Sequence, residues 1–263
     1  MKRILTAIAA LALVATTAVP ATAGMLDDIR GRNVVRIGVS LGGEPIGFRD
    51  PQNNPVGYDV DVANMIAAKL GVPVEFTDVS GDARISMLVS GQLDIVVANT
   101  SATLERAKSV NFTIPYNRAG LRVIVQADSG ITKLEDLAGK KIVVGRGTTG
   151  ETFIKTAVPT AELVYVDQFA PDGVLQLQQK RVDAAIEDSS LLDYLATKNP
   201  TLVTLAGLYS NDPISIAVAK GDTEFVRWLD MFVSDYIQSG AYEANYKKWW
   251  GETANPPELI ALW

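Results

Sequence analysis

The sequence predicts an α/β fold with mostly parallel sheets. Short β-type runs alternate with amphipathic helical segments almost throughout residues 34–250, and no low-complexity stretch or internal repeat interrupts them. The composition is that of an ordinary globular protein, with 48% hydrophobic and 21% charged residues among 263. Sheets of this kind bind ligands at the carboxyl ends of their strands, beside helix N-termini, so the candidate site is sought there.

The first half of the chain gives strands and helices with clear ends. Asp59 is a suitable N-cap for a helix whose apolar residues share one face, and Gly71 ends that helix. Gly91 ends a second, shorter helix in the same way. The expected elements are strand 34–39, helix 59–70, strand 74–76, helix 84–89 and the buried strand 93–98.

The second half continues the alternation. Thr132 with Glu135, and Thr148 with Glu151, have the spacing of a capping box, in which a hydroxyl and a carboxylate satisfy the first N–H groups of a helix. The expected elements are strand 121–126, a short helix from 132, strand 141–144, helix 148–157, strand 163–166, helix 171–180, strand 182–186 and helices 224–239 and 242–250.

The chain contains no Cys and no His, which excludes several kinds of chemistry. It can form no disulfide, no thiolate nucleophile, no Cys/His zinc site and no Ser-His-Asp triad. The formal net charge of −6 argues against nucleic acid or an anionic membrane as the main partner. We expect neither a cofactor nor a metal ion.

The N-terminus is predicted to be a secretory signal peptide spanning 1–23. Lys2 and Arg3 precede an apolar run over 4–19, and Ala21 to Ala23 give a small-x-small cleavage pattern. We expect export to a periplasm with cleavage near Ala23. Cleavage would remove two of the 24 cations and leave 22 Lys and Arg against 30 Asp and Glu.

The first candidate site is the polar run that follows strand 93–98. Asn99 and Ser101 lie in this run, and a helix is expected to begin near Thr103 with Arg106 on its first turn. Backbone N–H groups and a planar guanidinium would then form a cradle for a carboxylate. The alternative interpretation is a surface arginine on a capped helix.

The second candidate site is the glycine-rich loop 145–150, which contains Arg146, Thr148 and Thr149. It matches G-x-G-x-x-G between a strand and a helix, with Asp167 about 20 residues further on, as in dinucleotide-binding proteins. Nicotinamide cofactors are scarce outside the cell, and the two Thr hydroxyls would suit a carboxylate. A structural turn is the third interpretation.

The third candidate is Asp188, which follows strand 182–186 and could pair with an ammonium group. The alternative role for this residue is the N-cap of a helix. Taken together, an arginine, a threonine loop and an aspartate at strand-to-helix junctions offer one partner for each end of a zwitterion.

The sequence from residue 35 to 251 resembles the periplasmic solute-binding proteins of ABC importers for polar amino acids, the family 3 extracellular solute-binding proteins. Many segments carry this resemblance in the order typical of the family. They are 35–39, 57–63, 88–94, 103–106, 112–116, 134–141, 147–149, 181–184 and 246–251.

The resemblance implies a two-lobed periplasmic binding protein type II fold, each lobe a mostly parallel sheet flanked by helices. Lobe 1 would comprise 24–118 and 216–263, and lobe 2 would comprise 119–215. The two crossing strands are expected near 117–121 and 214–217.

The resemblance also implies roles for individual residues. Arg106 would grip the α-carboxylate of an amino acid, with Ser101, Thr148 and Thr149 as further donors. Asp188 would take the α-ammonium, assisted by Asn99.

The loop 41–48 departs from the family pattern, because it lacks the usual aromatic residue and Pro-Pro-Phe. Phe48 could supply the missing ring. Arg84 lies in a segment that resembles the branch with acidic amino-acid binders, and Arg84 with Arg146 would favour Glu or Asp. Glu44 instead favours a basic or amide ligand. We therefore expect an acidic or polar amino acid.

The expected function is that of a monomeric, non-enzymatic substrate-binding component that delivers its ligand to a membrane permease. The alternative is a periplasmic enzyme similar to cyclohexadienyl dehydratase on the same fold, with Glu44 or Glu187 as acid or base. Ordinary carboxylates titrate near pH ~4 and Arg above ~12, so we expect affinity to be flat between about pH 6 and 8.

Overall fold

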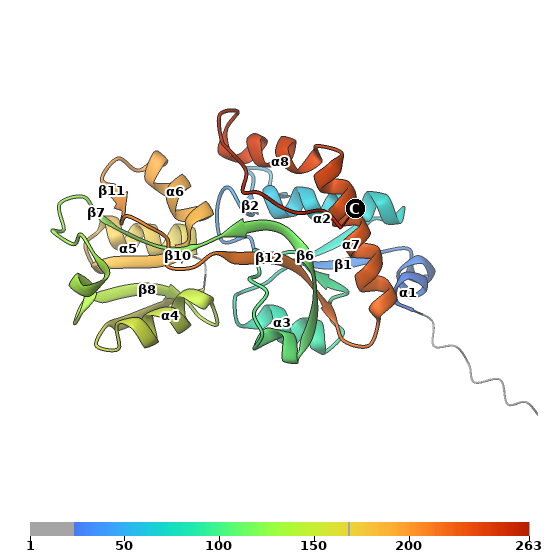
Figure 1. The fold of residues 1–263 in the computed structure, drawn as a ribbon, viewed down its shortest axis with the longest axis horizontal. Coiled ribbons are helices and arrows are strands. Elements are labelled where there is room, and N and C mark those ends of the chain that lie inside the picture. The colour runs from blue at the N-terminus through green and yellow to red at the C-terminus, as the bar shows by residue number, and fades with distance from the viewer. Residues whose placement is uncertain (1–23, 168, 263) are drawn as a thin grey trace, which may run out of the picture.

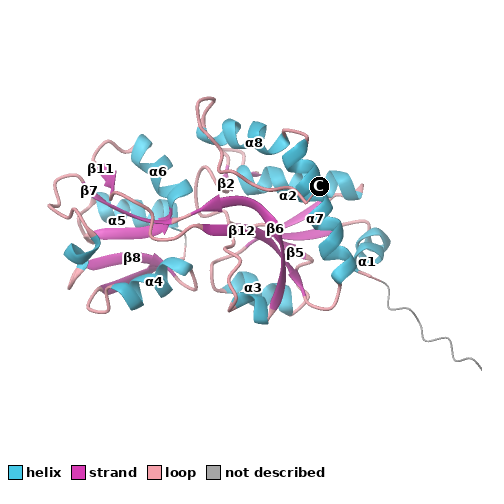
Figure 2. Ribbon diagram, in the orientation of Figure 1, coloured by secondary structure: helices cyan, strands magenta, loops and turns pink. Residues whose placement is uncertain are grey.

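The structure, a computed structural model, describes residues 24–167 and 169–262. Two five-stranded sheets lie side by side, each with its own helices on its outer faces (Figures 1 and 2). We call them the first and second lobes. The predicted signal peptide lies outside the described residues.

The first lobe has a sheet in the order β4-β1-β5-β12-β6. Its strands are β1 (Val35–Val39), β4 (Val74–Asp78), β5 (Ile95–Val96), β6 (Val110–Ala119) and β12 (Asp212–Ala219). Four of the five strands run in one direction, and β12 is antiparallel to both of its neighbours. The helices are α1 (Met25–Arg32), α2 (Tyr58–Leu70), α3 (Ala83–Val89), α7 (Thr223–Gln238) and α8 (Ala241–Trp250). A small hairpin is formed by β2 (Phe48–Arg49) and β3 (Pro55–Val56).

The second lobe has a sheet in the order β11-β7-β10-β8-β9. Its strands are β7 (Leu121–Gln126), β8 (Lys141–Gly145), β9 (Glu162–Val166), β10 (Ala184–Asp188) and β11 (Leu202–Thr204). Again four strands run in one direction, and β7 is reversed. The helices are α4 (Thr149–Ala157), α5 (Val174–Gln178) and α6 (Ser189–Lys198), with a 3-10 turn η2 (Leu134–Leu137) and a π-helical turn η3 (Phe169–Gly173). The expected mostly parallel sheets are confirmed in both lobes.

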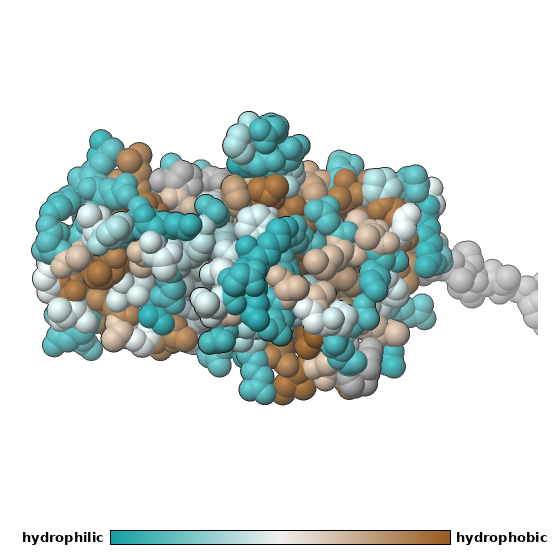
Figure 3. Space-filling view, turned by 90° about the horizontal axis from the view of Figure 1, so that it is seen from above, coloured by the Kyte–Doolittle hydropathy of each residue, from teal (hydrophilic) through white to brown (hydrophobic). Residues whose placement is uncertain are grey.

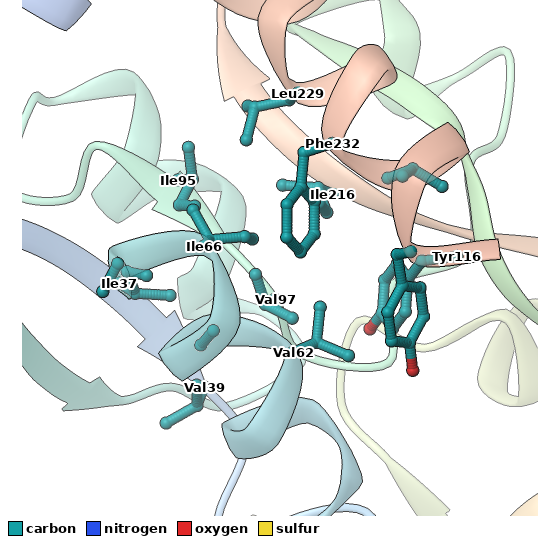
Figure 4. Close-up of a cluster of buried hydrophobic side chains, with 14 of the residues drawn as sticks. Ile37, Val39, Val62, Ile66, Ile95, Val97, Tyr116, Ile216, Leu229 and Phe232 are labelled. Atoms are coloured by element: carbon teal, nitrogen blue, oxygen red, sulfur yellow. The ribbon is translucent and has the colours of Figure 1, made fainter. Parts of the chain in front are cut away.

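Each lobe has its own hydrophobic core, as its amphipathic helices require. In the first lobe, β1 and β5 contribute Ile37 and Ile95, α2 contributes Ile66, and α7 contributes Phe232 (Figure 4). In the second lobe, buried aliphatic residues of β7, β8 and β10 pack against helices on both faces of the sheet. Because each core is independent, the two lobes can move as separate bodies.

The chain passes between the lobes at Gly120, between β6 and β7, and returns between β11 and β12. The two long strands β6 and β12 pair antiparallel, so that β6 ends and β12 begins on the side of the second lobe (Figure 1). The precise lobe boundaries stay a prediction.

Several local predictions were wrong for identifiable reasons. Asp59 is not an N-cap, because Gly57 takes that place and the Asp59 carboxylate turns inward. Thr132 and Glu135 form no capping box, because the Asp136 carboxylate accepts the local N–H groups instead. The helix expected near Thr103 is only a 3-10 turn, η1 (Arg106–Lys108). The capping role of Thr148 is confirmed.

Helix α6 begins directly after β10 with Asp188 at its N-cap position, the alternative role considered for this residue, but the Asp188 side chain makes no capping hydrogen bond. Helix α1 and strand β11 were not predicted from the sequence, and strands near β6 and β12 were expected only from the family resemblance. Within the described residues, no helix combines the length and hydrophobicity needed to cross a lipid bilayer. On the face seen in Figure 3, hydrophobic residues lie in small groups among hydrophilic ones.

Candidate functional site

A polar cavity lies between the two lobes, where strands of both sheets end. Eight of the ten predicted ligand-binding residues line it: Arg84, Asn99, Ser101, Arg106, Arg146, Thr148, Thr149 and Asp188. The first lobe supplies the first four and the second lobe the others. Segments far apart in the sequence therefore meet at one site, as expected if the ligand binds at the carboxyl ends of the strands.

Arg106 brings a half-buried guanidinium to the cavity. Its Nη1 donates to the carbonyl of Ser101 at 2.8 Å, and its Nη2 donates to the carbonyl of Gly147 in the second lobe at 2.9 Å. Burial and the nearby Arg84 lower the pKa of Arg106 to about 10, so it stays protonated at neutral pH. Its hydrogen-bond partners in the described residues are carbonyls, which leaves its charge available for a ligand carboxylate.

Asp188 ends strand β10 and is 4% exposed. Its Oδ2 accepts from Nδ2 of Asn99 across the cleft at 2.7 Å, whereas its Oδ1 is buried and has no hydrogen-bond partner among the described residues. Burial, followed by the charges of Glu187 and Asp212, raises the pKa of Asp188 well above its usual range. An unpartnered buried carboxylate oxygen calls for a cationic donor.

Arg84 and Glu187 add a second pair of opposite charges to the lining. Arg84 is held rigidly, because Nη1 donates to the carbonyl of Ala98 and to Oγ1 of Thr100, and Nε donates to the carbonyl of Gly81. Burial raises the pKa of Glu187, and the charge of Arg84 opposes that rise. Side chains of both charges thus line the cavity, which suits a zwitterion.

The glycine-rich loop is organised by the start of α4. Thr148 caps the helix by accepting from the N–H of Glu151 at 3.2 Å, and its hydroxyl donates to the carbonyl of Gly145. The Glu151 carboxylate accepts from the N–H of Gly147 at 2.7 Å. Thr149 belongs to the first turn, where helix geometry leaves the N–H group without an intrahelical acceptor, so it can donate to an anion.

Arg146 lies at the edge of the cavity, with its guanidinium 4.2 Å from the centre of the Tyr165 ring. This stacking fixes the side chain near the part of the cavity also lined by Asp82 and Asp167.

Two predicted residues are not among those that line the cavity. The Glu44 side chain hydrogen-bonds the hydroxyl of Tyr194 on α6. The ring of Phe48 lies edge-on to Trp249 at 5.8 Å, in the first lobe. The aromatic residue of the lining is Phe169, which was not predicted from the sequence although it follows the carboxyl end of a predicted strand.

The two lobes contact each other directly around the cavity, which makes this a closed arrangement. Besides the bonds of Asn99 and Arg106, the N–H of Ala170 donates to the carbonyl of Gly42 at 2.9 Å. Nε1 of Trp250 on α8 donates to the carbonyl of Ser190 on α6 at 2.8 Å.

No group of acidic residues that could hold a metal ion occurs in the described part of the chain.

Two lobes of this topology, with a polar cavity between them, define the class of type II solute-binding proteins. The chain belongs to the bacterial extracellular solute-binding proteins of family 3, whose family model matches residues 35–252. The resemblance seen in the sequence is thereby confirmed.

Three relatives illustrate the range of the family. The L-cystine-binding protein TcyJ of Escherichia coli (strain K12) is 26% identical over 255 residues, covering 95% of this chain and 96% of that protein. The structure of a mutant of ArgBP from T. maritima is 34% identical, with a TM-score of 0.82 over 87% of this chain and 100% of that one. The ancestral amino acid-binding protein AncCDT-1, a precursor of cyclohexadienyl dehydratase, is 32% identical, with a TM-score of 0.81 over 86% and 99% of the two chains.

Proposed function

We propose that the protein is an exported, monomeric binding component that captures one free α-amino acid between its lobes and delivers it to an ABC-type membrane permease. The proposal rests on two groups in the cavity, one cationic and one acidic, that lack a partner of opposite charge. Arg106 has no carboxylate partner in the described residues, and Oδ1 of Asp188 has no donor. An α-carboxylate and an α-ammonium would satisfy both.

Family membership supports binding of an amino acid but not a particular one, because the relatives include proteins named for cystine and arginine. We propose an acidic or polar side chain, since Arg84 and Arg146 both line the cavity. An Arg146→Gln variant should then weaken binding of L-glutamate more than binding of L-glutamine. Equal loss for both ligands would argue against a carboxylate at this position.

The binding proposal is tested by calorimetry on ligands found in a thermal-shift screen of the common amino acids, because a bound ligand stabilises the folded state. We expect a Kd near micromolar, about −8 kcal/mol. Arg106→Ala and Asp188→Asn should each weaken binding at least ~30-fold, because each leaves a buried charge of the ligand unpaired.

The matched control for Arg106 is Lys108→Ala. Lys108 lies on the same turn, but its side chain is 71% exposed and pairs with Glu105. Affinity should not change in this variant. Undiminished affinity in Arg106→Ala would contradict the proposed site.

A second candidate function rests on the structural likeness to AncCDT-1 and on Glu187, a buried carboxyl with a raised pKa in the cavity. These features would suit a dehydratase acting on a cyclic carboxylate, with Glu187 as the general acid. Turnover of prephenate or arogenate that is lost in Glu187→Gln would establish this activity, and absence of turnover would leave the binding function.

A further inference from the structure

Asp59 is a buried carboxylate that the proposed ligand contacts do not use. It lies in the first turn of α2, is 1% exposed and forms no salt bridge with the described residues. Its Oδ2 accepts from the backbone N–H of Asn99 at 2.7 Å, and its Oδ1 accepts from the hydroxyl of Tyr116 at 2.8 Å. Burying a carboxylate without a cation is costly, so a role for these two bonds is expected.

The bond to Asn99 bears directly on the cavity. Asn99 has φ of 44°, the left-handed conformation that residues other than glycine seldom adopt and that asparagine tolerates best. In this conformation its side chain reaches across the cleft and donates to Oδ2 of Asp188 at 2.7 Å. A continuous series of hydrogen bonds therefore runs from the core of the first lobe, through Asn99, to a carboxylate of the second.

The surroundings of Asp59 keep it fixed. Tyr116 on β6 is fully buried, and its carbonyl accepts from the hydroxyl of Tyr58 at 3.0 Å. The hydroxyl of Tyr236 on α7 donates in turn to that of Tyr58. Through its bond from Tyr116, Asp59 is therefore tied to the buried core of the first lobe at the end of the series opposite Asp188.

We infer that Asp59 is a positioning residue for ligand binding: it holds Asn99 in the left-handed conformation from which its amide orients the Asp188 carboxylate toward the ligand's ammonium group. The inference rests on the proposed function for its effect on affinity. The hydrogen-bonded coupling of Asp59 to Asn99 does not depend on that function and can be tested without a ligand.

The ligand-free test is a ¹⁵N NMR titration of the mature protein between about pH 5.5 and 8.5. Burial raises the pKa of Asp59 to about 7, while the bonds from Tyr116 and Asn99 and the charge of Arg84 oppose that rise. The backbone amide signal of Asn99, whose N–H donates to Asp59, should therefore shift with a midpoint near this value. The shift should disappear in Asp59→Asn and move to higher pH in Tyr116→Phe, which loses a bond to the charged form.

The binding test uses L-glutamate and L-glutamine as probes in a double-mutant cycle. Asp59→Asn should weaken affinity about tenfold in the native background but less than about twofold in Asn99→Gly, because Gly adopts the left-handed conformation without support. Asp61→Asn is the matched control: it lies on the same helix but bonds Lys248 and Trp249, so affinity and the Asn99 signals should not change.

Equal losses in both backgrounds, or Asn99 signals that do not respond to Asp59, would overturn the inference. A failure of both probes to bind the native protein would instead count against the proposed ligand. In that case the titration alone decides the coupling of Asp59 to Asn99.

Discussion

The structure gives Asp188 a higher pKa than an ordinary aspartate has. Burial and the neighbouring charges of Glu187 and Asp212 raise its pKa, and the bond from Asn99 opposes that rise only in part. A protonated Asp188 could not accept from the ammonium group of the proposed ligand, so binding would release any proton held by this carboxyl. The flat pH dependence expected from ordinary carboxylate pKa values is therefore replaced by a different prediction.

Because the pKa of Asp188 is raised, we expect affinity to rise with pH as this carboxyl loses its proton, by at most about tenfold per pH unit. Arg106 contributes nothing to this change, because its pKa of about 10 keeps it charged throughout. Calorimetry in two buffers with different heats of ionisation would detect the released proton. Constant affinity with no proton release would show that Asp188 is already ionised in the free protein.

Several residues that line the cavity were predicted from the sequence, because polar groups that follow buried strands lie together at one edge of a sheet. Arg106 and Asp188 are the main examples. Phe169 and Asp59 were not assigned to the site, because their roles depend on which segments pack around them. Glu44 and Phe48 were expected in the cavity from a comparison of loop 41–48 with the family pattern, and their side chains instead contact Tyr194 and Trp249.

At the scale of elements, the cavity closes where the loop between β4 and α3 meets the loop between β8 and α4. A Cβ atom on Gly81 would lie 2.5 Å from the carbonyl oxygen of Arg146 in the opposite lobe. Since the contacted atom belongs to the backbone, no side-chain rotation can relieve the clash. Glycine at this position allows the two loops to approach.

Gly81→Ala should therefore oppose closure and weaken ligand affinity by about tenfold or more, while the melting temperature of the ligand-free protein changes little. Small-angle scattering with saturating ligand should show a larger radius of gyration than for the native protein. Gly31→Ala is the control, because a Cβ there meets nothing within 4 Å. Native affinity in Gly81→Ala would mean that the loops do not meet in the bound state.

The alternation of strands and helices was predictable because hydrophobic periodicity and capping residues are local signals. The strands β6 and β12 were not predicted as elements: their polar positions, including Asn117 and Ser215, are buried at 1% exposure and break the pattern. The register also shifts between Ile214 and Ala217, which no local signal indicates. Only the family resemblance pointed to crossing strands in this region.

At the scale of the whole molecule, the cavity and the contacts between the lobes form in the same closed arrangement. Contacts between the lobes that lie away from the cavity should therefore affect ligand affinity. Trp250 provides such an outside contact. Its Nε1 donates to the carbonyl of Ser190 in the second lobe at 2.8 Å, while its ring stacks on Tyr246 at 4.3 Å in the first. The aromatic rings of α8 pack against one another, and one of them also bridges the lobes.

Trp250→Phe should keep the stacking but remove the bridging hydrogen bond, which is worth about 1 kcal/mol in the closed state. Affinity should fall about fivefold through faster ligand release, although the residue is not among those lining the cavity. Trp249→Phe is the matched control, since its Nε1 donates at 2.8 Å to Asp61 within the same lobe. That change should lower stability without altering ligand release. Stopped-flow dissociation rates for the two variants separate these outcomes, and equal rates would show that the Trp250 contact does not stabilise the ligand-bound arrangement.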